Sequence, residues 1–305
     1  MIASPPSSAR SRLRPGLNLV EVLVVLGVVG LLVGLTLPAI QQARAAAERV
    51  ACQSRLRQIG LALQGHHDTL GAFPPGQDPA FFAQAQGPIE GVSWLAKLLP
   101  FVEQQLLWEQ TQQAVRQDRA PWHNPPHVGL ATVIPLYTCP SDPRVAAPQQ
   151  GPDGVLAAYT SYKGVRGTIS GRDDGVLPLG YTVRVANITD GTSQTIMVGE
   201  RPPSARLDSG WWYTSHWSAY THDFILWAEM RGESPYCIPP PPVGRFVFGP
   251  GRFSNQCDLY HFWSPHGGGA NFSFADASVR YLSYSISPKL RDLASRAGGE
   301  AVELP

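Results

Sequence analysis

The chain has 305 residues, with 24 Lys and Arg against 23 Asp and Glu, so its formal net charge is +1. This near-neutral balance, without a long basic run, argues against a nucleic-acid-binding protein, whose affinity would depend on neutralising phosphates. A hydrophobic content of 43% excludes a chain that is disordered throughout. The 30 Gly and 29 Pro residues exceed average usage and favour a fold rich in loops.

The N-terminal region contains a basic stretch followed by a long apolar run. Arg10, Arg12 and Arg14 precede Pro15-Gly16, and residues 22–40 carry no charge. As a helix, this run is about 30 Å long, which matches the hydrocarbon thickness of a bilayer. Basic residues before the run orient the N-terminus towards the cytoplasm. We therefore expect a single membrane span with the C-terminal domain outside the cytoplasm, in the periplasm.

A signal anchor or a cleaved secretory signal is the simplest alternative explanation for this region. A secretory signal has an apolar core of about 7–15 residues, and its cleavage site follows that core. Here the candidate cleavage site, Gly16, precedes the apolar run. We therefore expect a leader at residues 1–16 and a transmembrane helix at residues 17–42 that stays on the mature chain.

Glu21 is an unusual residue in this position, because a carboxylate at the edge of a membrane span costs a few kcal/mol unless it has a partner. The amino group freed at Leu17 would be a suitable counter-ion, on the same chain or a neighbouring one. Gly16, Leu17 and Glu21 resemble the prepilin cleavage and methylation motif of type IV pilins and type II secretion pseudopilins. The resemblance implies cleavage between Gly16 and Leu17 by a prepilin peptidase, methylation of the new amine, and a role for Glu21 in assembly. Leu17 and Asn18 depart from the Phe and Thr that are usual in the motif.

The helix is expected to continue beyond the membrane as an amphipathic segment over residues 43–70. This segment is rich in good helix formers, and Gly71 with the following Pro74-Pro75 ends it. Apolar residues at helical spacing form one stripe: Cys52, Leu56, Ile59 and Leu63. A long N-terminal helix that packs on a head domain predicts an α+β fold of the pilin type.

The head, residues 71–305, is predicted to be loop-rich with an antiparallel sheet. Residues 93–99 form an apolar run that favours a strand, and Pro100 favours the first turn of a helix that ends near Asp118. Residues 271–282 predict a hairpin whose two-residue loop is Asp276-Ala277, which places Phe274 opposite Val279. The second loop position needs a positive φ, which costs an alanine about 1 kcal/mol. A short helix is expected at residues 288–297.

The C-terminal motif provides a second resemblance. Pro265, His266, the glycines at 267–269, Asn271 and Asp276 resemble the H-x9-DG motif that ends a large bacterial family of unknown function with prepilin-type N-termini. Ala277 departs from the glycine of that motif. Shorter matches lie along the chain, at residues 52–63, 67–75, 98–101, 139–142 and 190–193. The resemblance implies an architecture and a location rather than an activity.

Two groups of residues suggest chemistry, each with a structural alternative. His266 and Asp276 suggest acid–base catalysis, but no nucleophile in a strand–turn–helix setting accompanies them, so we expect His266 to anchor the hairpin and Asp276 to form its turn. Asp173, Asp174 and Asp190 are weak calcium candidates without EF-hand spacing, and ordinary turn chemistry is the alternative. We expect no enzymatic activity, no cofactor beyond this weak calcium option, and no other metal.

The four cysteines include no C-x-x-C pair, which disfavours a zinc ribbon, and an extracytoplasmic domain favours disulfides. Of three possible connectivities, we favour Cys52–Cys139, which would fix the head to the helix, together with Cys237–Cys257. The second bond would close a loop rich in Pro and Gly, with a stabilisation of about 3 kcal/mol. Free buried thiols are the alternative.

The sequence leaves two functions open. The first is a pseudopilin-like structural subunit in the inner membrane, whose partners are a prepilin peptidase, membrane lipid and other subunits that pack through the N-terminal helix. The second is a membrane-anchored module that binds a glycan or an exported substrate on an aromatic surface. The residues of that surface, which would otherwise be core, are Trp211, Trp212, Tyr213, Trp217 and Tyr220.

Overall fold

The computed structural model describes residues 18–77, 91–152, 154–214, 224–232, 237, 244–300 and 302–303. The chain divides into two compact units, residues 1–46 and 47–305. The expected leader, the run of four prolines at 239–242, Trp217 and Tyr220 all lie outside the described residues.

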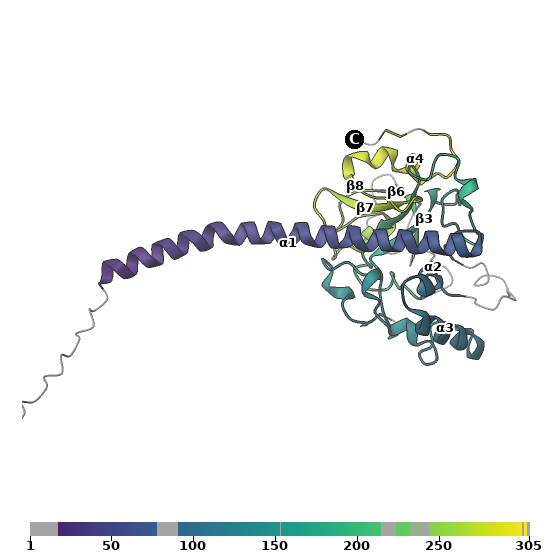
Figure 1. Cartoon of the computed structure of the whole chain (residues 1–305), viewed down its shortest axis with the longest axis horizontal. Helices are drawn as coiled ribbons and strands as arrows, with labels where there is room; N and C mark the ends of the chain where they lie inside the picture. Colours follow the sequence, from purple (N-terminus) through teal and green to yellow (C-terminus); the bar gives the residue numbers. More distant parts are fainter. Residues whose placement is uncertain are drawn as a thin grey trace, which may run out of the picture. The chain divides into compact units, whose positions relative to one another are not determined.

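The N-terminal helix α1 extends over Leu19–Leu70 as one element that includes Pro38 (Figure 1). It ends where Gly71 adopts a φ of 79°, a left-handed conformation that favours glycine. Within the second unit, the expected stripe is fully buried: Cys52, Leu56, Ile59 and Leu63 are each 0% exposed. The amphipathic pattern therefore predicted correctly which side of the helix packs on the head.

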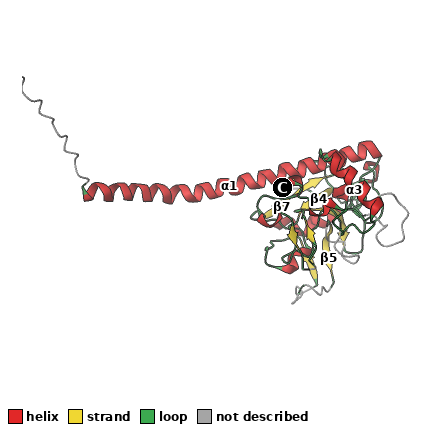
Figure 2. Cartoon of the chain, turned by 90° about the horizontal axis from the view of Figure 1, so that it is seen from below, coloured by secondary structure: helices red, strands yellow, loops and turns green. Residues whose placement is uncertain are grey.

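The head is built around a six-stranded sheet with the order β6-β5-β3-β4-β7-β8. Its strands, shown in yellow in Figure 2, are β3 (Tyr162–Ile169), β4 (Ile196–Glu200), β5 (Ile225–Arg231), β6 (Arg245–Val247), β7 (Gly269–Phe274) and β8 (Val279–Ser283). The sheet is mixed rather than purely antiparallel, because β3 and β5 are parallel and the other neighbouring pairs are antiparallel. Strands β4 and β5, which follow one another in the sequence, therefore lie on opposite sides of β3. Strands β1 (Gln149–Gln150) and β2 (Leu156–Ala157) form a separate antiparallel pair.

The sheet separates two hydrophobic cores, because strand side chains alternate between its faces. In β7, Asn271 and Ser273 point towards α1, whereas Phe272 and Phe274 pack with Phe262 on the opposite side. The first core joins α1 to the helical loops, and the second joins the sheet to the C-terminal helix α4 (Leu290–Ala294). Both faces of β7 are therefore buried.

Short helices connect these elements. The predicted strand at residues 93–99 is wrong: the segment forms helix α2 (Trp94–Lys97), because the Ser93 hydroxyl accepts a hydrogen bond from the Ala96 amide and caps it. The helix expected from Pro100 to Asp118 is divided between a 3-10 turn, η2 (Leu99–Phe101), and α3 (Gln105–Gln117). Further 3-10 turns in the described part of the chain are η3 (Val128–Ala131), η4 (Pro135–Tyr137), η5 (Pro143–Val145), η6 (Val185–Asn187), η7 (Gln256–Tyr260) and η8 (Tyr284–Lys289).

The C-terminal hairpin exists, but its register differs by one residue from the prediction. The loop contains three residues, 275–277, and Ser273 rather than Phe274 lies opposite Val279. The Phe274 carbonyl accepts from the Ala277 amide, and Ala277 has a φ of 63°, as in a type I turn followed by a bulge. The positive φ at Ala277 was predicted correctly, whereas the loop length was not. The short helix expected at residues 288–297 is divided between η8 and α4, and the Ser283 hydroxyl caps η8 by accepting from the Ser285 amide.

The described part of the aromatic cluster belongs to the core. Trp211, Trp212 and Tyr213 are each 0% exposed. Trp212 donates its indole N–H to the Thr132 carbonyl, and the Tyr213 hydroxyl bonds with His127. These three side chains are therefore not available as a binding surface.

Candidate functional site

The start of α1 is the first candidate site. Gly16 and Leu17 lie outside the described residues. The Glu21 carboxylate accepts a hydrogen bond from the Asn18 amide at 3.2 Å, and the Asn18 side-chain oxygen accepts from the Val20 amide at 3.3 Å. This reciprocal arrangement is that of a capping box, which satisfies amides that have no partner within the helix. The sequence reasoning had missed this local role of Glu21.

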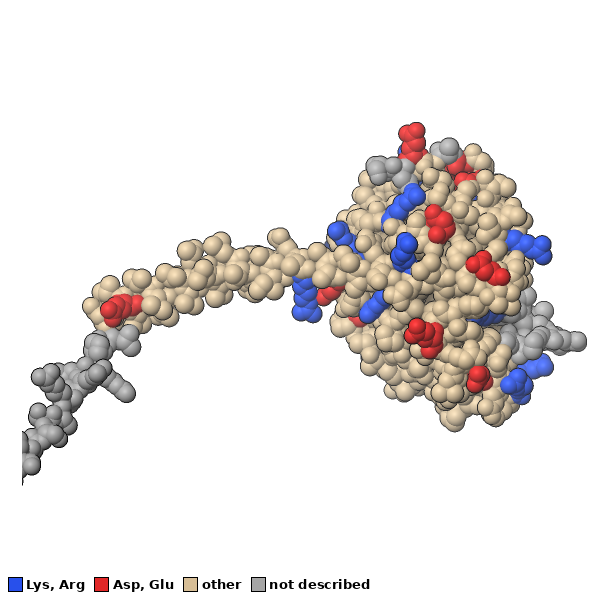
Figure 3. Space-filling model, in the orientation of Figure 1, with Lys and Arg blue, Asp and Glu red and all other residues tan. Residues whose placement is uncertain are grey.

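The first half of α1 is apolar on all sides. Leu23, Leu31 and Leu35 are each at least 60% exposed, and other Leu and Val side chains between Leu19 and Ile40 resemble them. Figure 3 shows this stretch as an almost unbroken tan surface. Over an 18-residue window its mean hydropathy is 2.6, and none of that window is buried. By length and composition, the helix is able to cross a membrane or to act as a signal sequence.

His266 lies in a buried cluster of polar side chains inside the head. Its Nε2 is 3.4 Å from Glu200 Oε1 and 3.8 Å from Cys139 Sγ. Cys52 of α1 completes the group, and the candidate ligand atoms of all four residues lie within 4.8 Å of one another. Residues distant in the sequence thus meet at the contact between α1 and the sheet.

Asp276 does not belong to this cluster. Its exposed carboxylate accepts a hydrogen bond from the Ser278 amide at 2.8 Å, as in an Asx turn. The two motif residues therefore have separate positions: Asp276 forms the hairpin turn, and His266 lies buried before β7. His266 and Asp276 therefore do not pair with one another.

Sequence reasoning also missed Glu200. It ends the fully buried strand β4, and its side chain is 2% exposed. Asn271 donates to it from the backbone amide at 2.7 Å and from the side-chain amide at 3.0 Å. Gln53 of α1 in turn donates to the Asn271 side-chain oxygen at 3.0 Å. The signal in the sequence was a single acidic residue at the end of an otherwise apolar strand.

The cluster has strongly perturbed protonation equilibria. Burial opposes protonation of His266, but hydrogen bonds to Cys139 and Glu200 and the charge of Glu200 outweigh it and raise the pKa of His266 to about 9. A hydrogen bond from Cys52 lowers the pKa of the Cys139 thiol to about 6, despite its burial. The same contact and burial raise the pKa of Cys52. These contacts favour the anionic form of Cys139 and the cationic form of His266, whereas Cys52 stays protonated.

The comparison with protein families gives a match over residues 41–289, to the family described as "Protein of unknown function (DUF1559)". The chain belongs to the DUF1559 family. The match includes all four residues of the buried cluster, and it begins after the apolar first half of α1. No curated protein and no solved structure matches the chain.

The four cysteines of this DUF1559 protein comprise one disulfide-bonded pair and one pair without a disulfide. Cys237 and Cys257 form the expected disulfide, with an S–S distance of 2.03 Å. The expected bond between Cys52 and Cys139 is absent: both are buried and neither is disulfide-bonded. Their proximity was anticipated correctly, but a carboxylate and an imidazole share their surroundings, which the spacing of the cysteines alone does not reveal.

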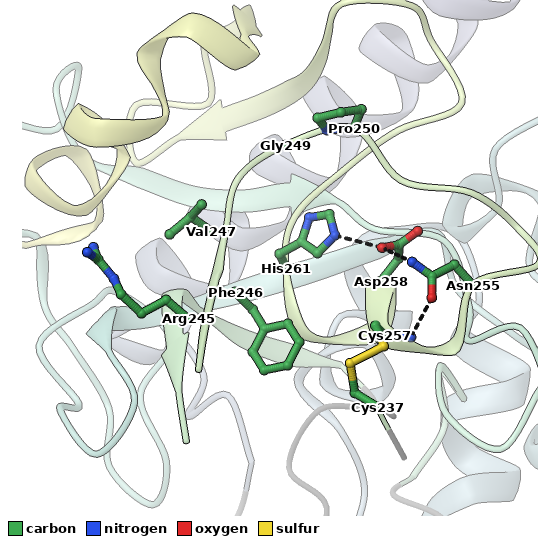
Figure 4. Close-up of a pocket in the computed structure, with 10 residues that line it drawn as sticks. All are labelled: Cys237, Arg245, Phe246, Val247, Gly249, Pro250, Asn255, Cys257, Asp258 and His261. Carbon is green, nitrogen blue, oxygen red and sulfur yellow. Dashed lines mark hydrogen bonds and ion pairs between the residues drawn. A yellow bond between two sulfur atoms is a disulfide. The ribbon is translucent and has the colours of Figure 1, made fainter. Parts of the chain in front are cut away.

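A pocket of about 440 Å³ lies beside the Cys237–Cys257 bond (Figure 4). His261 and Asn255 are both directed at Asp258, at 3.1 and 2.8 Å. Asp258 also accepts from the Arg252 amide. These polar groups satisfy one another within one loop, so we assign them a structural role.

The weak calcium candidates are engaged in hydrogen bonds within the head. Asp173 pairs with Arg166, Asp174 accepts from the amide and hydroxyl of Thr168, and Asp190 accepts from two backbone amides. Those amides are Gly298 and Gly299, after α4. Such contacts are typical of turn chemistry. Within the described ranges, these aspartates are not part of the group of possible metal ligands around His266.

Proposed function

We propose that this DUF1559 protein is a non-enzymatic, pseudopilin-like subunit of a type II secretion or type IV pilus-like assembly. The observation that carries the proposal is α1, Leu19–Leu70. Its first half is apolar and exposed on all sides, and its second half packs as an amphipathic helix on the head. One element thus combines a segment suited to lipid or to other helices with a segment fixed to a domain.

The proposal places the protein in the inner membrane as a single-pass protein, with its head in the periplasm. A prepilin peptidase would remove residues 1–16 and methylate the amine of Leu17. Apolar side chains such as Leu23 and Leu31 would then contact lipid before assembly and neighbouring α1 helices afterwards. Glu21 would pair with the new amine of an adjacent subunit, a contact that removes the cost of a carboxylate at the membrane edge.

Glu21 substitutions test this proposal, since two roles of the residue are separable. Glutamine preserves the side-chain oxygen that accepts from the Asn18 amide but removes the negative charge. If Glu21 acts in assembly through its charge, both Glu21→Gln and Glu21→Ala eliminate the chain from sedimentable high-mass assemblies in the bacterium that makes it. The matched control is Glu109→Gln, on α3 in the head.

The outcomes separate the two roles. Loss of assembly in both Glu21 variants, with normal assembly of the Glu109 variant, supports the proposal. Normal assembly of Glu21→Gln with loss in Glu21→Ala would mean that Glu21 only caps the helix, which contradicts a charge-based role in assembly. Normal assembly of both variants would contradict the assignment as a prepilin-like subunit.

A further inference from the structure

The buried cluster around His266 has no role in the proposed function, and its composition is specific. Cys52 comes from α1, Cys139 follows η4, Glu200 ends β4, and His266 precedes β7. Their side chains converge although these positions span more than two hundred residues of the sequence. The four are 0%, 2%, 2% and 8% exposed, respectively. Four separate segments thus bring two sulfurs, one carboxylate and one imidazole to a single point.

Two of the distances between these atoms match those of a tetrahedral metal site, and the whole group is only slightly wider. Zinc binds sulfur at about 2.3 Å and nitrogen or oxygen at about 2.0–2.2 Å, so neighbouring ligand atoms in a tetrahedron lie roughly 3.3–3.8 Å apart. In the head, His266 Nε2 is 3.4 Å from Glu200 Oε1 and 3.8 Å from Cys139 Sγ. All four candidate atoms lie within 4.8 Å of one another. Only small side-chain movements would be needed to surround an ion.

The chemical types of the four candidate ligands favour Zn²⁺ over other metal ions. Two thiolates and an imidazole suit Zn²⁺, and a carboxylate is its usual oxygen ligand, whereas Mg²⁺ and Ca²⁺ prefer oxygen donors only. Four protein ligands complete a tetrahedron and leave no open position for a substrate. Such closed, buried sites are structural rather than catalytic.

A second layer of contacts holds the carboxylate in place. Asn271 donates to Glu200 from both its backbone and its side-chain amide, and Gln53 donates to Asn271. Outer hydrogen bonds of this kind orient metal ligands and tune their basicity. Because Gln53 neighbours Cys52 on α1, the same helix contributes a sulfur and the outermost support of the carboxylate.

We propose that Cys52, Cys139, Glu200 and His266 bind one Zn²⁺, which fixes α1 to the sheet of the head. This inference is independent of the proposed function, since it concerns the inside of the second unit. In this arrangement the histidine of the H-x9-DG motif is a metal ligand, and the aspartate of the motif forms the turn that follows.

A Cys52–Cys139 disulfide is the competing state. It would link the same two segments, but it requires neither the carboxylate nor the imidazole that lie against the sulfurs. A disulfide would leave Glu200 and His266 as a buried ion pair. The free-energy cost of removing such a pair from water can exceed the attraction between its charges. Zinc uses all four groups, and therefore accounts for more of the cluster.

The test uses the full-length chain in detergent, with zinc alone as the ligand. After dialysis against a slight excess of Zn²⁺, we expect one zinc per chain by elemental analysis. Replacement by Co²⁺ should give the intense visible bands and the sulfur-to-cobalt charge-transfer absorption of a tetrahedral thiolate site. Cys52 and Cys139 should resist alkylation until a strong chelator is added, as located by peptide mapping. This last measurement needs no variant, so it does not depend on whether a variant folds.

Variants locate the site. Cys139→Ser and His266→Gln should each lose stoichiometric zinc, whereas His261→Gln, which alters another buried His–acid pair, should retain it. A Cys52–Cys139 disulfide in protein isolated from the extracytoplasmic side would overturn the proposal. Alkylation of both thiols at equal rates with and without zinc would also overturn it, as would undiminished zinc binding in both variants.

Discussion

Gly60 of α1 lies directly against Ala277, the residue with positive φ in the β7–β8 turn. A Cβ atom at position 60 would be 3.1 Å from the Ala277 Cα and 2.6 Å from the Ser273 hydroxyl. Glycine is therefore required here by close approach, since the helix backbone contacts the turn itself. The contact fixes where along α1 the hairpin packs.

A valine at position 60 is expected to weaken the head. Because Ala277 contributes backbone atoms to the contact, the neighbour cannot simply rotate away, and overpacking of this kind costs about 1–3 kcal/mol. Gly34→Val is the matched control, since nothing lies within 4 Å of a Cβ there. Urea unfolding of the full chain in detergent, followed by tryptophan fluorescence, measures the difference. Equal midpoints for the two variants would contradict this description of the contact.

Ala277→Gly is expected to stabilise the hairpin by about 0.5–1 kcal/mol. Alanine at a φ of 63° is strained by roughly 1–2 kcal/mol, and glycine removes that strain at some cost in unfolded-state entropy. Ala275→Gly, two residues earlier, removes the same methyl group from a buried position without positive φ and should destabilise the chain. A thermal midpoint that falls in both variants would show that the methyl contact at 277 outweighs the strain.

The hairpin also shows which of its features the sequence could predict and which it could not. The alternation of residues 271–282 predicted two strands and a strained Ala277, and both are present. It did not determine the loop length, because two- and three-residue loops are both compatible with Asp276-Ala277. The partner of Val279 consequently changed from Phe274 to Ser273. Since β7 is buried on both faces, apolar alternation provided a weak constraint on register.

In other parts of the fold, too, local features were predicted from the sequence and features that depend on packing were not. The stripe from Cys52 to Leu63 predicted the buried side of α1, because helical periodicity is a local property. The run at residues 93–99 was misassigned, since a short apolar segment fits a buried helix as well as a strand and the Ser93 cap decided between them. The cluster around His266 was unpredictable as a whole, because its members meet only through the packing of α1 on the sheet.

Removal of the Cys237–Cys257 bond is expected to cost about 3 kcal/mol. The bond closes a segment with a sequence separation of 20, which restricts the unfolded chain. The double variant Cys237→Ser/Cys257→Ser should lower the unfolding free energy of the non-reduced protein by this amount. Addition of reductant should then change the stability of the unmodified chain much more than that of the variant. Equal stability of both proteins under non-reducing conditions would contradict a contribution from this bond.

The head is expected to lose stability as the pH falls below about 6.5, through His127. This side chain is 0% exposed, one ring nitrogen is 2.7 Å from the Asp118 carbonyl oxygen, and the other is 2.9 Å from the Tyr213 hydroxyl. Burial lowers the pKa of His127 below its ordinary value near 6.5. The unfolded chain therefore binds its proton first, so this contribution is complete above 6.5 and is lost as the pH falls towards the folded-state pKa.

His127→Gln removes that titration. Its unfolding free energy should change less between pH 7 and pH 5 than that of the unmodified chain, as measured by urea unfolding at several pH values. A variant that retains the full pH dependence would contradict a role for His127. His66, whose pKa burial also lowers, should account for part of the remaining slope in the variant.

The most direct test of the prepilin-like assignment is the mass of the mature N-terminus. The full-length chain is produced in a bacterial host with and without a prepilin peptidase, and its N-terminal peptide is analysed by mass spectrometry. With the peptidase, we expect a chain that begins at Leu17 and carries one methyl group on its amine. A chain that still begins at Met1 with the peptidase present, or one that begins after Ile40, would contradict the assignment.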